Sequence, residues 1–205
     1  MLITVFLQPL LSVHFGLIWR IIFTGIILSG TFSLEFKKRT RNILITCGTV
    51  TIFLTWLSYF IINDLLKIAG YLSFFCFNLF ITIFMVRHIA RSQNVTLTIL
   101  INSINCYLLI GVLGAVLLAA EGILQEFVFH LDAGGINFAG NGAIGFHDYL
   151  YFSFVTMTTL GYGDVTPISS TAKSTTIIIA VAGQLYLTIL VAMLVGKFLS
   201  RTQLD

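Results

Sequence analysis

The residues best suited to chemistry lie in one short run, T-L-G-Y-G-D at Thr159–Asp164. A dehydrated potassium ion needs several oxygens in place of its water shell, and a column of backbone carbonyls can supply them. Carbonyls alternate in direction along an ordinary strand, so they all point one way only where some residues adopt conformations that glycine reaches at little cost. Gly161 and Gly163 stand at the alternate positions that such a backbone requires. We therefore predict an ion-binding site made by the backbone oxygens of Thr159, Leu160, Gly161 and Tyr162, with Gly163 completing the segment.

The side chains of this run have a different role from its backbone. Leu160 and Tyr162 would point away from the ions into the surrounding protein, and Thr159 can add a hydroxyl oxygen at the inner end. One chain supplies one such loop, and one loop cannot encircle an ion. Four copies around an axis can, so the mechanism implies a homotetramer.

The composition indicates which elements hold this run. Of the 205 residues, 58% are hydrophobic and only 9% are charged, and the mean hydropathy is +1.01. A soluble domain of this length needs a charged surface, so these values predict a protein of the lipid bilayer. The net charge of +3 gives no reason to expect nucleic acid as a partner. Cys47, Cys76 and Cys106 each lie in an apolar run without a Cys or His at metal-ligand spacing, which predicts apolar packing rather than disulfides or metal ligands.

Apolar stretches of about 20 residues are long enough to cross a bilayer as helices. The N-terminal 36 residues predict a short first helix ending near Pro9, a turn over Leu10–Phe15 and a helix from Gly16 to Leu34. A single helix with an outside N-terminus is the alternative. The fold class is therefore an all-α membrane protein with about six spanning helices. The four clearest spans are Ile43–Ile62, Ile68–Val86, Val95–Ala120 and Thr171–Phe198.

Basic residues near the span ends predict the orientation, because they favour the cytoplasmic side. Alternating the spans puts eight of the eleven basic residues on one side, and Arg20, Lys67 and Lys173 on or toward the other. Arg87 and Arg91 stand at a cytoplasmic helix end, where anchoring explains them better than voltage sensing, which needs several regularly spaced basic residues within a span. No cleavable signal peptide is expected, nor a cytoplasmic ligand-binding domain after Phe198.

The segment Gly122–Pro167, on the outer side, does not fit a span. Its first half is rich in glycine and reads as a loop, and Glu121 would end the preceding helix. Its second half, about Asp148–Thr158, is apolar and would rise only about 16 Å as a helix, roughly half of the hydrocarbon thickness. Non-helical backbone at that depth is tolerated only where it is buried in protein or lines water. These properties predict a re-entrant pore helix followed by a returning loop.

With these elements in place, Phe154–Pro167 (F-V-T-M-T-T-L-G-Y-G-D-V-T-P) resembles the pore signature of the potassium channel family. The last span, with G-Q-L-Y-L at Gly183–Leu187, is similar to that of small bacterial ion-channel proteins. Leu160 departs from the family, in which Val or Ile is commoner there, but it keeps the apolar role. Residues 1–94 are expected to be N-terminal membrane helices without a clear voltage sensor, and there the likeness to the family is only in the number of helices. The resemblance itself extends from about Val95 to Phe198. It implies residues 95–200 as a two-helix pore module with its pore loop at 146–167.

The resemblance also implies an activity, namely conduction of K⁺ down its electrochemical gradient through a tetramer in the cell membrane. K⁺ would be the permeant ion, no cofactor is expected, and the partners are further copies of the chain and the lipid bilayer. The chain is not expected to be an enzyme, because no span carries paired acids, a Ser/Lys pair or a His cluster. The alternatives are a non-selective cation channel and a modulatory channel subunit.

Several residues have expected supporting roles, each with a simpler reading beside it. Glu121 either braces the loop after the filter, as in similar channels, or is an exposed interfacial acid. Tyr151 and Phe152, with Tyr162, either form an aromatic cuff around the filter or face lipid. Gly183 is either a gate hinge or a site of close helix packing.

Other expectations follow from position. Asp148 suits the N-terminus of the half-length helix, where a carboxylate can accept from unpaired N–H groups. Thr158 supports the filter from below, and Asp164 closes it at the outer mouth. Glu126 and Asp132 read as solvated loop acids that could also concentrate cations. The predicted lining of the inner cavity is Thr188, Val191, Ala192 and Val195.

Overall fold

Helices make up nearly all of the described chain, because lipid offers no partner for backbone N–H and C=O groups that a helix satisfies internally. The computed structural model describes residues 15–32, 38–61, 64–92, 96–129, 135–138 and 144–202. The predicted short helix near Pro9 and most of its turn lie outside these residues, as does Asp132. The elements are α2 (Phe15–Phe32), α3 (Lys38–Phe60), α4 (Asp64–Arg91), α5 (Leu97–Phe129), β1 (Ile136–Phe138), α6 (Phe146–Met157), β2 (Val165–Pro167) and α7 (Ser170–Thr202).

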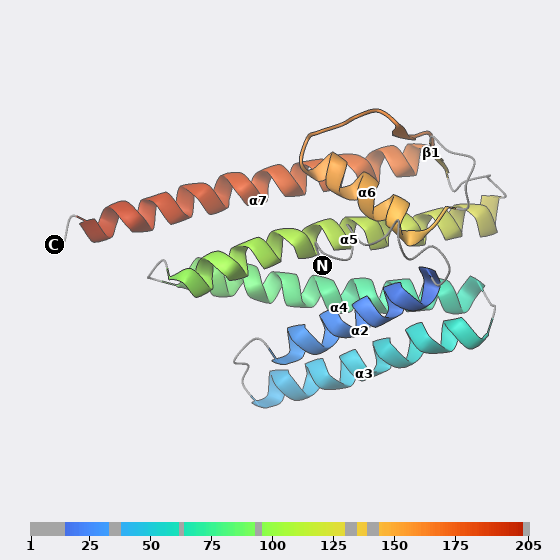
Figure 1. The fold of residues 1–205 in the computed structure, drawn as a ribbon, viewed down its shortest axis with the longest axis horizontal. Helices are drawn as coiled ribbons and strands as arrows, with labels where there is room; N and C mark the ends of the chain where they lie inside the picture. Colours follow the sequence, from blue (N-terminus) through green and yellow to red (C-terminus); the bar gives the residue numbers. More distant parts are fainter. Residues whose placement is uncertain are drawn as a thin grey trace.

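The long helices lie roughly side by side, and in the view of Figure 1 α5 lies between α7 and the bundle of α2, α3 and α4. Toward its C-terminal end α7 also contacts α4, where Lys197 Nζ donates to the Ile89 carbonyl at 3.2 Å. Within the described chain, three helical stretches are long and apolar enough to cross a membrane: Leu65–Arg91, Leu97–Glu126 and Ser170–Lys197. The chain is therefore an all-helical membrane protein in its main elements. The count of six spanning helices stays a prediction. Arg87 and Arg91 are exposed at the end of α4.

The predicted end of α5 was wrong. The span was predicted to end at Ala120 and the helix at Glu121, but the helix continues through Gly122 to Phe129, eight residues beyond Glu121. Glycine in a helix interior costs about 1 kcal/mol relative to alanine, which a single position does not make prohibitive. Gly122 also has a packing reason, because a Cβ there would lie 2.5 Å from the Tyr149 hydroxyl on α6. The residues that follow it are apolar or good helix formers, so nothing in them ends the helix.

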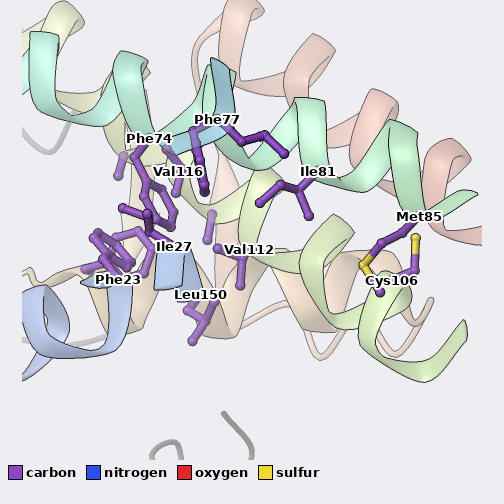
Figure 2. Packing of buried hydrophobic residues seen from close by; sticks show 14 of the residues in the cluster. Phe23, Ile27, Phe74, Phe77, Ile81, Met85, Cys106, Val112, Val116 and Leu150 are labelled. Atoms are coloured by element: carbon purple, nitrogen blue, oxygen red, sulfur yellow. The ribbon is translucent and has the colours of Figure 1, made fainter. Parts of the chain in front are cut away.

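Two apolar clusters hold the helices together. The first joins α2, α3, α4, α5 and the start of α6, and Figure 2 shows part of it around Phe23, Phe74 and Val116. The Phe23 ring stacks on Phe74 with centroids 4.2 Å apart and meets Phe146 edge-on at 4.9 Å. The second joins α5, α6, α7 and β1, and consists of Leu118, Ile136, Phe152, Met157, Ala172 and Ile179. Because α6 contributes to both clusters, it is fixed to both halves of the chain.

A two-stranded antiparallel pairing of β1 with β2 was not predicted from the sequence. Ile136 pairs with Pro167 and Phe138 with Val165. The amides of Ile168 and Ser169 both donate to the Gly135 carbonyl, at 2.8 and 3.0 Å. The pairing brings the chain back to the N-terminal end of α7. The helix α6 begins at this same end of α7.

Candidate functional site

The short helix α6 begins at a cap made by its own third residue. The Asp148 carboxylate accepts from the Gly145 amide through Oδ2 at 2.8 Å, and the Asp148 amide donates to the Gly145 carbonyl at 3.1 Å. The other carboxylate oxygen lies 3.0 Å from His147 Nε2. A negative side chain here satisfies an end amide and complements the positive end of the helix dipole. Asp148 therefore lies where capping requires it.

The other end of α6 lies halfway along α7. A Cβ on Gly183 would lie 2.7 Å from the Met157 carbonyl oxygen, so the two backbones are in direct contact, and Gln184 Nε2 donates to the same oxygen at 3.4 Å. Gly183 is 13 residues past Ser170, a rise of about 20 Å along α7. Roughly 30 Å of hydrocarbon surrounds a spanning helix, so α6 ends well inside it.

The chain then returns over seven residues, 158–164, before β2 begins. Seven extended residues span at most about 25 Å, which is enough to cover that depth. Figure 1 shows the returning segment as a thin stretch that runs from the inner end of α6 back toward the strands.

The last turn of α6 ends on an unusual residue. The Thr159 amide donates to Thr156 O and the Leu160 amide to Val155 O, both at 3.0 Å. This pair of bonds is the Schellman ending of a helix, which needs a left-handed residue that is usually glycine. Here that residue is Thr159, with φ +61°. A β-branched residue is rarely left-handed, and the conformation costs on the order of 1–3 kcal/mol.

Left-handed residues then recur at every second position. Gly161 has φ +54° and Gly163 φ +82°. Thr159 is the one non-glycine residue with positive φ in the part of the chain that the structure describes. Thr158, Thr159 and all the residues up to Asp164 are exposed in the single chain, with Leu160 55% and Tyr162 67% exposed. The left-handed residues of this segment thus fall at the alternate positions that a column of backbone carbonyls would require.

Asp164 is tied back to α6 at the outer end of this segment. The Tyr151 hydroxyl donates to Asp164 Oδ2 at 2.6 Å, and Oδ1 accepts from the Val165 amide at 3.1 Å. Phe152 instead is buried in the cluster with Leu118 and Ile136. The two neighbouring aromatics therefore contact different parts of the chain, and of the two it is Tyr151 that bonds to Asp164.

Glu121 takes part in a polar network that includes a residue the sequence analysis missed, Gln125. The Glu121 carboxylate accepts from Thr175 Oγ1 on α7 at 2.8 Å and from Gln125 Nε2 at 2.9 Å. Gln125, which is only 4% exposed, also donates to Ser169 Oγ at 3.0 Å and to Thr171. Glu121 thus reaches the segment after the filter through Gln125. The sequence could have indicated this pair, because Gln125 follows Glu121 by four positions in an otherwise apolar helix. Side chains at that spacing lie next to each other on the helix surface.

The residues predicted to line an inner cavity share one property. Thr188, Val191, Ala192 and Val195 are all exposed on α7 in the single chain, whereas Gly183 is buried against α6. Glu126 is exposed near the end of α5. Within the described ranges, no group of three or more His, Cys, Asp or Glu side chains is arranged to hold a metal ion.

Comparison with known proteins points to the same region. Residues 116–200 match the sequence model of a family described as ion channel, which is a family of channels rather than enzymes. Two-pore potassium channel 4 of Arabidopsis thaliana is 41% identical over 63 residues, which cover 31% of this chain and 22% of that protein. The chain thus matches about a fifth of this relative's length. No solved structure matches significantly.

The matched residues hold the second half of α5, all of α6, the T-L-G-Y-G-D run and nearly all of α7. The resemblance predicted from Phe154–Pro167 is confirmed: residues 116–200 match the ion-channel family model, and part of the chain is 41% identical to a potassium channel.

Proposed function

We propose that the chain is one subunit of a homotetrameric, potassium-selective channel of the cell membrane, with K⁺ as its permeant ion. The observation that carries the proposal is the positive φ at Thr159, Gly161 and Gly163, in an exposed segment that starts halfway down α7. Backbone oxygens of Thr159, Leu160, Gly161 and Tyr162 would replace the hydration shell of the ion. The Thr159 hydroxyl adds an oxygen at the inner end.

The helix dipole of α6 also favours a cation at the proposed ion site. Its C-terminal end, which carries a partial negative charge, lies at mid-depth beside α7, where a cation crossing the bilayer would be least hydrated. The carbonyls of Val155 and Thr156 already accept backbone bonds, so the dipole acts as a field rather than as direct ligands.

Assembly follows from what a single chain leaves uncovered. Backbone groups of residues 159–163 would each cost several kcal/mol if they faced lipid. One face of α7 is also apolar and exposed, as expected of a helix that packs against other copies. Its exposed apolar residues are Ile177, Ile178, Val181, Leu185, Ile189, Val191 and Val195. Four copies around one axis would bury both the segment and this face.

Reversal potentials of the purified chain in planar bilayers, measured in mixed potassium and sodium, test the proposal. We expect a reversal potential near that of potassium for the wild-type chain and for Gly25→Ala, a position on α2 where a Cβ would meet nothing within 4 Å. Gly161→Ala should abolish the current, because a Cβ disfavours φ +54°. Equal permeability to the two ions would instead identify a non-selective cation channel. Current that requires a second channel protein would identify a modulatory subunit.

Binding of ions only to the assembled state provides a second test. Such an ion stabilises the assembly by mass action. The tetramer should therefore resist heat better in potassium than in sodium on a native gel. A monomer or dimer in mild detergent, with the same melting in both salts, would contradict the proposal.

A further inference from the structure

The side chain of Lys197, near the C-terminal end of α7, reaches the last turn of α4. Its Nζ donates to the Ile89 carbonyl at 3.2 Å and to the Ala90 carbonyl at 3.3 Å. Because α4 ends at Arg91, no amide within that helix can reach these two oxygens. A cation at this position provides donors for both oxygens and complements the negative end of the helix dipole. Lys197 therefore caps α4 from another helix, at the end of the bundle that faces inward in the predicted topology.

This contact connects two parts of the chain that the sequence predicted as separate. The helix α4 belongs to residues 1–94, and α7 belongs to the pore module of residues 95–200. Tyr186 on α7 bonds instead within the pore module, because its hydroxyl donates to the Ser103 carbonyl on α5 at 2.8 Å. Lys197 lies 11 residues beyond Tyr186, which is about 16 Å further along the helix. A movement of α4 would therefore act on the inner part of α7 through Lys197.

The packing of α7 against α4 between Tyr186 and Lys197 is incomplete. A cavity of about 110 Å³ lies there between the two helices. Apolar side chains line it from both sides, among them Ile89 of α4 and Leu190 and Met193 of α7. A void leaves the side chains around it without part of their van der Waals contacts. Packing therefore holds this part of α7 only loosely against α4, and the two bonds of Lys197 contribute more to its position.

The side of α7 that Lys197 occupies is opposite to the side predicted to line the inner cavity. Val191 and Val195 lie four positions apart on that predicted lining, and both are exposed in the single chain. Lys197 follows Val195 by two residues, which places it about 200° round the helix from that valine. In the proposed tetramer, Val191 and Val195 would face the axis, whereas Lys197 would hold α7 away from it.

We propose that Lys197 is a positioning residue for conduction, which holds the inner end of α7 against α4 and so keeps the inner mouth of the channel open. This role rests on the proposed function, because it needs four α7 helices around a conducting path. Without the bonds to α4, the four helices would approach one another at this end. Their exposed valines would then form an apolar constriction, and such constrictions close a pore by losing their water.

Single-channel recordings of the purified full chain in planar bilayers, with potassium on both sides, measure the effect on opening. Lys197→Met keeps an apolar side chain and removes the donor, and Lys197→Arg keeps a donor. We expect Lys197→Met to lower the ratio of open to closed time about fivefold or more, the size expected for the loss of one net hydrogen bond. Lys197→Arg should restore most of this ratio. Arg41→Met is the matched control, since it removes an exposed basic residue predicted on the same side, and it should leave the ratio unchanged.

Amide hydrogen exchange of the same proteins, followed by mass spectrometry, tests the contact without any current. Residues 187–196 of α7 should exchange faster in Lys197→Met than in the wild type, Lys197→Arg and Arg41→Met, because local opening becomes easier. A wild type without potassium-selective current would refute the proposed function, whereas faster exchange in Lys197→Met would still show that Lys197 holds α7 against α4.

Three results would overturn the role of Lys197. Unchanged exchange in Lys197→Met would show that its bonds do not hold α7. Faster exchange with an unchanged ratio of open to closed time would make Lys197 a structural contact only. A ratio that rises in Lys197→Met would show that the contact favours the closed channel.

Discussion

Replacing Gly183 with alanine tests whether this glycine is a packing site. The new Cβ would lie 2.2 Å from Met157 Cγ and 2.7 Å from the Met157 carbonyl oxygen. A methionine side chain can move aside, but the carbonyl belongs to the last turn of α6 and cannot. Either α6 or α7 must shift by several tenths of an ångström. The helix that carries the candidate ion site would then lose its contact with α7.

The magnitude follows from a matched substitution on the same helix. Gly196→Ala introduces a methyl group that meets nothing within 4 Å, so it changes only helix propensity, a gain of about 1 kcal/mol. Gly183→Ala gains the same stability from helix propensity, but overpacking against Met157 lowers the stability by about 1–3 kcal/mol. The difference between the two variants therefore isolates that penalty. One kcal/mol shifts the melting temperature of a chain of this size by about 2–4 °C, so Gly183→Ala should melt about 2–12 °C below Gly196→Ala.

The assay is thermal unfolding of both variants in one detergent and one potassium concentration, followed by circular dichroism. Adding Met157→Ala to Gly183→Ala should recover only part of the loss, because the clash with the backbone oxygen remains. Equal melting temperatures for Gly183→Ala and Gly196→Ala would refute the packing explanation. If the Gly183→Ala channel also opened abnormally, the hinge explanation would replace it.

Three further variants, one of them a double substitution, test the segment and its supports. The double variant Gly161→Ala, Gly163→Ala should abolish potassium flux into proteoliposomes, because each left-handed residue with a Cβ costs about 1–2 kcal/mol. Unchanged flux would exclude this segment as the filter. Tyr151→Phe removes the hydroxyl bound to Asp164, so up to about tenfold more potassium should be needed for half-maximal protection against heat; an unchanged titration would show that the bond is dispensable. Gln125→Leu should lower the free energy of unfolding by about 1–3 kcal/mol in denaturant, because the half-buried Glu121 carboxylate loses a hydrogen-bond donor. A neutral result would mean that the network does not stabilise the fold.

The helices could be predicted because each depends on local sequence alone. A long apolar stretch flanked by polar residues predicts a spanning helix wherever it occurs, and Ile68–Val86 and Thr171–Phe198 both lie inside observed helices. The half-length helix was expected over Asp148–Thr158 and is found at Phe146–Met157. The two-residue offset at its start arises because Asp148 caps from the third helical position rather than from the position before the helix.

The features that were missed depend on distant residues. Strand β1 forms only because β2, almost 30 residues later, offers its edge, and neither strand is long enough to be recognised alone. Gln125 is buried because Ser169, 44 residues away, accepts its hydrogen bond. The end of α5 was misplaced because the glycine at position 122 reads as a helix terminator until Tyr149 is seen packed on it. Each of these contacts requires the fold before it can be inferred.

Thr159 affects both the stability of the C-terminal end of α6 and the proposed binding of the ion. Glycine would form the same Schellman ending without the steric penalty, so the conformation of this residue does not explain why it is threonine. What threonine adds is a hydroxyl group, which in the single chain donates to the Thr158 carbonyl at 2.6 Å. A residue held in an unfavourable backbone conformation at a candidate site is evidence that its side chain has a function. On that argument, Thr159→Gly should relieve strain in α6 and weaken ion binding, whereas Thr159→Ser, which keeps the hydroxyl, should retain it. Potassium-dependent protection against heat separates the two outcomes, and equal protection in both variants would show that the backbone oxygens alone bind the ion.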